Sequence, residues 1–250
     1  MTAELQPIAD IGAFASTRDS LHRVAEHVLA KARFVHDREI RLTATDGGFG
    51  TPLLPDNTRV RVDGSDLVVD TAGRSARIGL TTIADAAAFV GIIPGFPVEL
   101  YPAATPFEPD QPLDLDGDAA RSLAAWYGFT AEVLGQFAVE VREASPSPLI
   151  LWPEHFDQAF FTEDEAEGRR ANYGASPGDD GHAEPYMYVG PWGATDGDEF
   201  WNAPNFNGAM LSLKELVTEP DPRAAALKFL RSGRAHLVSL GSSQQEKPVS

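Results

Sequence analysis

The segment VRVDGSDLVVDTAGRSARIGL, residues 60–80, decides the fold class. Apolar strand residues flank the turn sequence Asp-Gly-Ser-Asp at 63–66, which is the pattern of a β-hairpin. A second turn at 72–74 leads into a third alternating stretch, and residues 81–91 read as a short helix with threonines at its start and glycine at its end. Successive strands followed by a helix predict an α+β fold, with mainly antiparallel β-sheet(s) flanked by several helices, rather than repeated βαβ units.

Three longer helices are expected, one before this sheet in the sequence and two after it. After an N-terminal arm of about a dozen residues, the first begins near Ser16, the second near Asp118, and the third covers 222–240 with an interruption at Gly233. Prolines recur through 94–117 and preclude regular structure there, so we interpret this segment as a Pro-rich covering loop. With a frayed tail at 241–250, these elements predict a single α+β domain over residues 1–250.

Composition limits the classes of function. The chain has 250 residues and a formal net charge of −17, which repels phosphate backbones and anionic lipids, so we expect neither nucleic-acid nor membrane partners. No cysteine is present, which excludes disulfides, thiolate metal sites and thiol nucleophiles. The N-terminus lacks the pattern of a secretory signal, and no apolar run is long enough to span a bilayer. We therefore expect a cytoplasmic protein, and the scarcity of lysine suggests a bacterial origin.

The first long helix carries His22, Glu26 and His27. Their order is H-x-x-x-E-H, so the H-E-x-x-H helix of zinc proteases is absent. His22 and Glu26 lie one helical turn apart and could pair. We interpret both histidines as surface or boundary residues.

Residues 151–204 contain the best candidate for a functional site. They include three of the four tryptophans, two histidines and many acids, in the stretches LWPEHFDQAFF, NYGASPGDDGHAEPYMYVGPW and FWNAP. Large aromatics beside histidine and carboxylates, punctuated by glycine and proline, are typical of ligand sites. If the chain stays extended through 153–161, alternation places His155 and Asp157 on one face of a strand.

The first hypothesis for this segment is a metal-dependent enzyme of the hydrolase type. The candidate ligands of a divalent metal ion are His155, Asp157, Asp179 and Glu184, since imidazole with carboxylates suits several such ions. Glu154 would then be a base acting on a metal-bound water, and the candidate catalytic residues are Glu154, His155 and Asp157. The competing interpretation is structural: His155 and Asp157 pair with each other or with backbone, and Asp179 caps its own turn.

The second hypothesis, which we favour, is a small-molecule-binding protein that need not be an enzyme. Aromatic and polar side chains would line a cleft together with the histidine and carboxylates. The candidate ligand-binding residues are Trp152, Tyr186, Trp192, Trp201 and Asn202. The alternative is that most of these aromatics form a core between sheets, as strand aromatics usually do. The sequence leaves enzyme activity, the presence of a metal ion and the oligomeric state open.

A family resemblance rests on six stretches taken together. RVAEHVL, GGFGTP, LWPEHFD, GASPGD, EPYMYVGPW and FWNAP occur in this order. Over nearly the whole chain the sequence resembles a bacterial family of hypothetical proteins without an assigned activity. The resemblance implies one continuous unit and carries no cofactor or catalytic residue with it.

Overall fold

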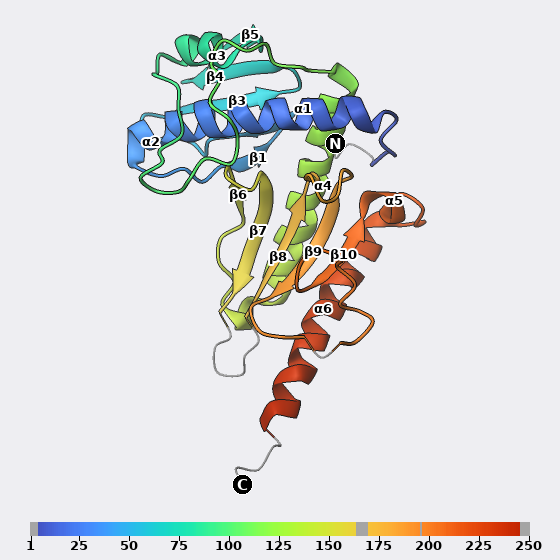
Figure 1. Cartoon of the computed structure of the whole chain (residues 1–250). Coiled ribbons are helices and arrows are strands. Elements are labelled where there is room, and N and C mark those ends of the chain that lie inside the picture. Colours follow the sequence, from blue (N-terminus) through green and yellow to red (C-terminus); the bar gives the residue numbers. More distant parts are fainter. Residues whose placement is uncertain (1–4, 164–169, 196, 246–250) are drawn as a thin grey trace. The chain divides into compact units, whose positions relative to one another are not determined.

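The computed structural model describes residues 5–163, 170–195 and 197–245, and it confirms the α+β class (Figure 1). Two five-stranded antiparallel sheets have the strand orders β1-β2-β3-β4-β5 and β10-β9-β8-β7-β6. Contacts divide the chain into two compact units. The first comprises Met1–Phe129 and Ile150–Gln158, and the second comprises Thr130–Leu149 and Ala159–Ser250. A single domain remains a prediction, and limited proteolysis that releases two stable fragments would contradict it.

The first unit opens with one continuous helical stretch. It consists of α1 (Ile11–Val24), a π-helical turn η1 (Ala25–Ala30) and α2 (Lys31–Asp37). The helix begins at Ile11 rather than near Ser16, because Asp10 Oδ1 accepts the backbone N–H groups of Gly12 and Ala13 and caps it. Our expectation of a longer N-terminal arm was therefore wrong. The apolar face of this stretch forms the core of the unit with Val60, Val62 and Leu67 of the sheet.

The first sheet follows the turn signals of the sequence. Its strands are β1 (Thr43–Thr45), β2 (Gly48–Gly50), β3 (Thr58–Asp63), β4 (Asp66–Thr71) and β5 (Arg74–Gly79). Asp63 pairs with Asp66 across the first turn, where Gly64 has φ 62°. Helix α3 (Ile83–Val90) is capped by Thr82, whose side chain accepts the N–H of Asp85, and ends at Gly91 with φ 80°. Both predicted hairpins and the short helix are thus confirmed.

Residues 92–116 contain no helix or strand and connect α3 to α4 (Gly117–Glu140). Helix α4 is continuous through Gly128. This helix starts in the first unit and ends in the second. Strand β6 (Ile150–Trp152) belongs to the first unit, where the Leu42 and Leu151 backbones form an antiparallel bridge.

The second unit contains the remaining sheet strands and two helices. They are β7 (Asp157–Thr162), which begins in the first unit, β8 (Ala171–Ser176), β9 (Tyr186–Pro191), β10 (Ala209–Ser212), α5 (Leu213–Leu216) and α6 (Pro222–Gln245). The core includes Phe137, Phe160 and Tyr173, with the Tyr173 ring 5.1 Å from Phe137 and 5.4 Å from Phe160.

Helix α6 is continuous through Gly233, contrary to the expected interruption. A Cβ at Gly233 would lie 2.7 Å from Val189 Cγ2, so this glycine is the point where α6 packs closely on β9. The helix also continues to Gln245, so residues 241–245 of the expected tail are helical, and the rest of that tail lies outside the described residues. None of the described helices is both long and apolar enough to cross a bilayer.

Candidate functional site

Residues 153–156 form a tight turn between β6 and β7. The Trp152 carbonyl accepts the N–H groups of His155 at 3.3 Å and Phe156 at 2.7 Å, and Phe156 has φ 53°. Positive φ is uncommon for a bulky residue and marks a strained backbone. The expectation of an extended chain through this segment was therefore wrong, and strand alternation does not relate His155 to Asp157. Trp152, a predicted ligand-binding residue, is half-buried.

Four predicted site residues belong to the first unit and lie in or beside this turn, but in different environments: Trp152, Glu154, His155 and Asp157. His155 is exposed, with its ring centroid 5.8 Å from that of Tyr101. Asp157 and Glu154 are buried, and the Glu154 Oε2 atom makes no hydrogen bond with the described residues. Burial raises the pKa of Glu154, and the carboxylates of Asp157 and Glu26 add to that increase. Burial thus favours the protonated form of Glu154, one of the three predicted catalytic residues.

His22 lies against the same turn. Its Nε2 is 2.8 Å from the Pro153 carbonyl oxygen, to which it donates, and its ring stacks on Phe156 at 4.9 Å. Burial lowers the pKa of His22, although Glu26 opposes that shift. The neutral imidazole therefore fastens the turn to α1.

Glu26 is completely buried and binds the Pro-rich loop rather than water. Its Oε1 accepts the N–H of Ala104 at 2.8 Å, and its Oε2 accepts the N–H of Thr105 at 2.8 Å and the Thr105 hydroxyl at 2.5 Å. A π-helical turn often marks a functional site, and η1 here directs Glu26 at the loop. A carboxylate with three donors is well compensated for its burial.

His27, the next residue, is also buried and contributes a second set of contacts. Its Nε2 is 3.1 Å from the Thr105 hydroxyl, and its carbonyl accepts the Gly95 N–H at 3.0 Å. Burial lowers the pKa of His27. The interpretation of His27 as a surface or boundary residue was wrong. The signal available in the sequence was a Glu-His pair inside the otherwise apolar helical stretch VAEHVLA.

The predicted site residues of the second unit belong to three aromatic groups. Tyr186 is near Tyr188 and Phe206, Trp192 near Phe161 and Arg170, and Trp201 near Phe200 and His236. The polar members have structural partners. Asn202 accepts the N–H of Met210 at 2.8 Å and donates to its carbonyl at 3.2 Å.

Asp179 caps its own turn, as the structural interpretation of the sequence supposed. Its Oδ1 accepts the N–H groups of Gly181 and His182, and its Oδ2 accepts the Tyr186 hydroxyl at 2.8 Å. Glu184 is half-buried. In the described part of the chain, no three histidine or acidic side chains are grouped so that they could hold a metal ion. Elemental analysis of the purified protein remains the test of the metal hypothesis.

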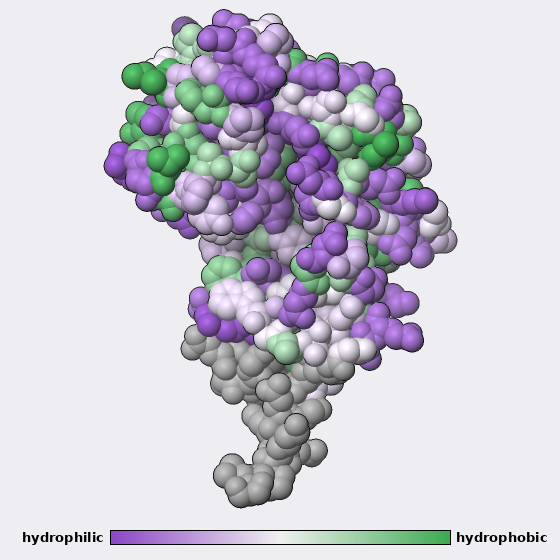
Figure 2. Space-filling model, in the orientation of Figure 1, coloured by the Kyte–Doolittle hydropathy of each residue, from purple (hydrophilic) through white to green (hydrophobic). Residues whose placement is uncertain are grey.

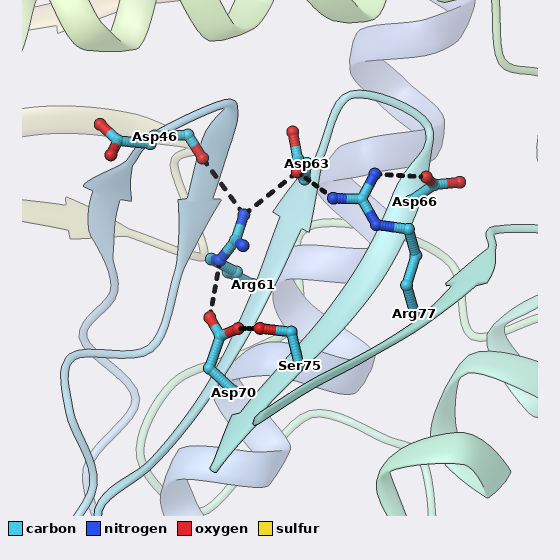
Figure 3. Close-up of polar contacts among 7 residues, drawn as sticks. All are labelled: Asp46, Arg61, Asp63, Asp66, Asp70, Ser75 and Arg77. Carbon is cyan, nitrogen blue, oxygen red and sulfur yellow. Dashed lines mark hydrogen bonds and ion pairs between the residues drawn. The ribbon is translucent and has the colours of Figure 1, made fainter. Parts of the chain in front are cut away.

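A charged network covers one face of β3–β5, and sequence reasoning did not select it (Figure 3). Arg61 donates to Asp70 at 2.8 Å and lies 3.3 Å from Asp63, while Arg77 pairs with Asp63 at 2.5 Å and with Asp66 at 2.9 Å. Ser75 donates to the other oxygen of Asp70, and that hydrogen bond is the largest cause of the lowered pKa of Asp70. The alternation of bases and acids in β3 and β4 was the available signal.

An open pocket of about 470 Å³ lies at the end of this face, and we call it the Arg59 pocket. It is lined by Leu53, Asn57, Arg59, Asp70, Thr71, Ala72, Gly73, Arg74 and Ser75. Register places Arg59 directly opposite Asp70, and Asp70 opposite Ser75. Within the described residues, neither Arg59 nor Arg74 forms an ion pair, and Arg59 Nε is a buried atom without a hydrogen bond.

Comparison with known proteins adds no family. No protein-family model matches the chain, and neither the curated proteins nor the solved structures contain a match. The resemblance to a bacterial family of hypothetical proteins therefore remains a prediction.

Proposed function

We propose that this protein binds a small anionic molecule, bearing a carboxylate or a phosphate, in the Arg59 pocket. The observation that carries the proposal is Arg59 itself. Its guanidinium lines the pocket, and its Nε atom makes no hydrogen bond within the described part of the chain. Arg59 also forms no ion pair among the described residues, so a bound anion would supply the counter-charge that this guanidinium lacks. Planar guanidinium groups suit carboxylate and phosphate oxygens.

The charges around the pocket support an anion despite the acidic chain. Asp70 is the carboxylate in the lining, and Arg61 and Ser75 already occupy both of its oxygens. Arg59 and Arg74 are not neutralised by ion pairs among the described residues, so the lining is locally positive. An anionic ligand would form its ion pairs with these two guanidinium groups.

Size and polarity narrow the class of ligand. A volume of about 470 Å³ falls in the range of small-molecule sites. Leu53 is exposed at the rim and offers an apolar contact, while Asn57 and Thr71 offer hydrogen-bond donors. A metabolite with one anionic group and a short apolar part matches this lining.

This proposal keeps the predicted class, a small-molecule-binding protein, and moves the site to the first sheet. It also keeps the expected setting, a bacterial cytoplasm, with neither nucleic acid nor membrane as a partner. The net charge of −17 supports the absence of both, since polyanionic surfaces repel an acidic protein.

Calorimetric titration of the full chain with inorganic phosphate and a panel of short aliphatic carboxylates tests the proposal. We expect saturable binding that weakens at least tenfold in Arg59→Gln. Arg77→Gln is the matched control, because Arg77 lies in the same sheet but outside the pocket lining. Equal losses of anion affinity in both variants would contradict the pocket, because binding would then depend only on the overall electrostatic potential of the sheet face. Absence of binding by every anion would also refute the proposal.

A further inference from the structure

The Pro-rich segment 92–110 exposes several large apolar side chains. Within 15 residues, Ile93, Val98, Leu100, Tyr101 and Phe107 are all exposed, Ile93 to 83% and Val98 to 68%. Concentrated exposure of this kind marks interaction surfaces more often than scattered apolar residues do. Figure 2 shows hydrophobic residues in separate small areas among hydrophilic ones on the face it presents.

The segment that carries these side chains is anchored to Glu26 and His27 of η1. Gly95 binds the His27 carbonyl, Ala104 and Thr105 bind the Glu26 carboxylate, and the Phe107 ring lies 5.2 Å from that of His27. Three stretches of the segment therefore contact the turn that carries Glu26 and His27, which holds the region 95–107 against the helix.

Further contacts fix both ends of this region. Phe96 is buried in a cluster with Ala30, Phe34 and Ile40. Arg23 Nη2 donates to the Glu108 carbonyl at 2.6 Å, and Ala84 donates to the Pro109 carbonyl at 2.9 Å. Prolines restrict the intervening backbone. A partner would therefore bind a preorganised surface and lose less conformational entropy from the loop.

The negative charge of the loop favours a positively charged partner. Residues 92–116 include five acids, at positions 99, 108, 110, 114 and 116, and no lysine, arginine or histidine. Glu99 and Glu108 are exposed and stand next to exposed apolar residues in the sequence. A second copy of this chain would bring another acidic loop and a further charge of −17, which opposes self-association.

We propose that this surface, which we call the loop surface (Ile93, Val98, Leu100, Tyr101 and Phe107 with Glu99 and Glu108), docks a basic, apolar peptide segment of another protein. Its apolar side chains cover those of the loop, and its lysines or arginines face the two glutamates. The inference is independent of the anion pocket, because it uses different residues.

The test uses fluorescence anisotropy with the full chain and a labelled twelve-residue peptide that alternates lysine with leucine and phenylalanine. We expect saturable binding, weakened at least tenfold by the double substitution Val98→Ser and Leu100→Ser. The matched control is Val139→Ser, which removes another exposed apolar side chain, on α4. Glu99→Gln with Glu108→Gln should weaken binding about threefold or more and reduce its salt dependence.

Two comparison peptides give the opposing outcomes. A peptide with glutamate in place of lysine should not bind, and one with serine in place of the apolar residues should bind at least tenfold more weakly. Unchanged binding by the Val98→Ser, Leu100→Ser protein would overturn the proposal, since attraction would then come from net charge alone. Equal binding of the glutamate peptide, or self-association without any peptide, would overturn it as well. Circular dichroism confirms that each variant is folded.

Discussion

The charged face of β3–β5 and the anchors of the Pro-rich loop are both polar, but they have different physical origins. On the sheet face the partners are close in sequence, such as Arg61 with Asp70 and Arg77 with Asp66, and their side chains are partly exposed. At η1 the partners are 78 or 79 residues apart, and the Glu26 carboxylate is completely buried. Exposed pairs in high dielectric contribute little, whereas a buried charge depends on every one of its hydrogen bonds.

The largest effect is expected from Glu26→Ala. The substitution leaves the N–H groups of Ala104 and Thr105 without their acceptor, and we expect a loss of about 3 kcal/mol in the free energy of unfolding. Urea unfolding measures the loss, and hydrogen exchange at these two amides should accelerate. Glu99→Ala, in the same loop but exposed, is the control. A loss no larger than the control's would mean that the loop is held by its apolar contacts instead.

The second effect is a loss of folding stability at acidic pH. Burial lowers the pKa of both His22 and His27 from their ordinary 6.5, so the folded protein holds them neutral while the unfolded chain takes up protons. Stability from these groups is present above pH 6.5 and is lost as the pH falls through their folded pKa values. Urea unfolding between pH 7.5 and 5 should show this loss.

The histidine origin of that loss can be separated from other acid effects. The stability of the double variant His22→Gln, His27→Gln should decline less steeply over the same pH range than that of the original protein. An unchanged slope in the double variant would place the acid sensitivity elsewhere, for example in the exposed ion pairs of the sheet face.

The third effect has the opposite sign. The raised pKa of Glu154 means that its contribution to stability is complete below its ordinary value of 4.5 and is lost as the pH rises through the folded pKa. Glu154→Gln should therefore become more stable relative to the original protein as the pH rises above 4.5. The same urea series, extended down to pH 4, measures the difference. A difference that stays constant with pH would show that Glu154 does not titrate differently in the two states.

The same contrast explains how much of the fold could be predicted. Asp63–Asp66 and Thr82–Gly91 carry their turn and cap signals within a few residues, so periodicity and turn chemistry suffice. The start of α1 was missed because Asp10 and the exposed Ile11 give no apolar period. The turn at 153–156 was missed because Phe156 adopts positive φ without a glycine or asparagine to announce it.

Some residues of the candidate site could likewise be predicted from the sequence, and others could not. Glu154 was selected by residue type, and its burial in the fold is what perturbs its acid–base behaviour. Its neighbour Glu26 was not selected, because pairing with Thr105 joins segments 79 residues apart and follows from no local pattern. The Arg59 pocket was also missed, since it arises where the start of β3 meets the turn between β4 and β5. The pattern of Arg59, Arg61 and Asp63 in β3 was the signal that could have indicated a charged face.

The smallest effect on stability, and the sharpest link between the sheet face and binding, is expected from Arg61→Gln. Arg61 is partly exposed, so removing its pairs with Asp70 and Asp63 should cost less than about 1 kcal/mol after solvent screening. Its loss would nevertheless remove the guanidinium that binds the Asp70 carboxylate in the lining of the Arg59 pocket and leave Ser75 as the hydrogen-bond donor to Asp70. Anion affinity should then fall several-fold while the unfolding midpoint in urea barely changes. If affinity is unchanged, Asp70 does not oppose the ligand, and the pocket's charge is set by Arg59 and Arg74 alone. If stability falls as far as in Glu26→Ala, the distinction between an exposed network and a buried anchor fails.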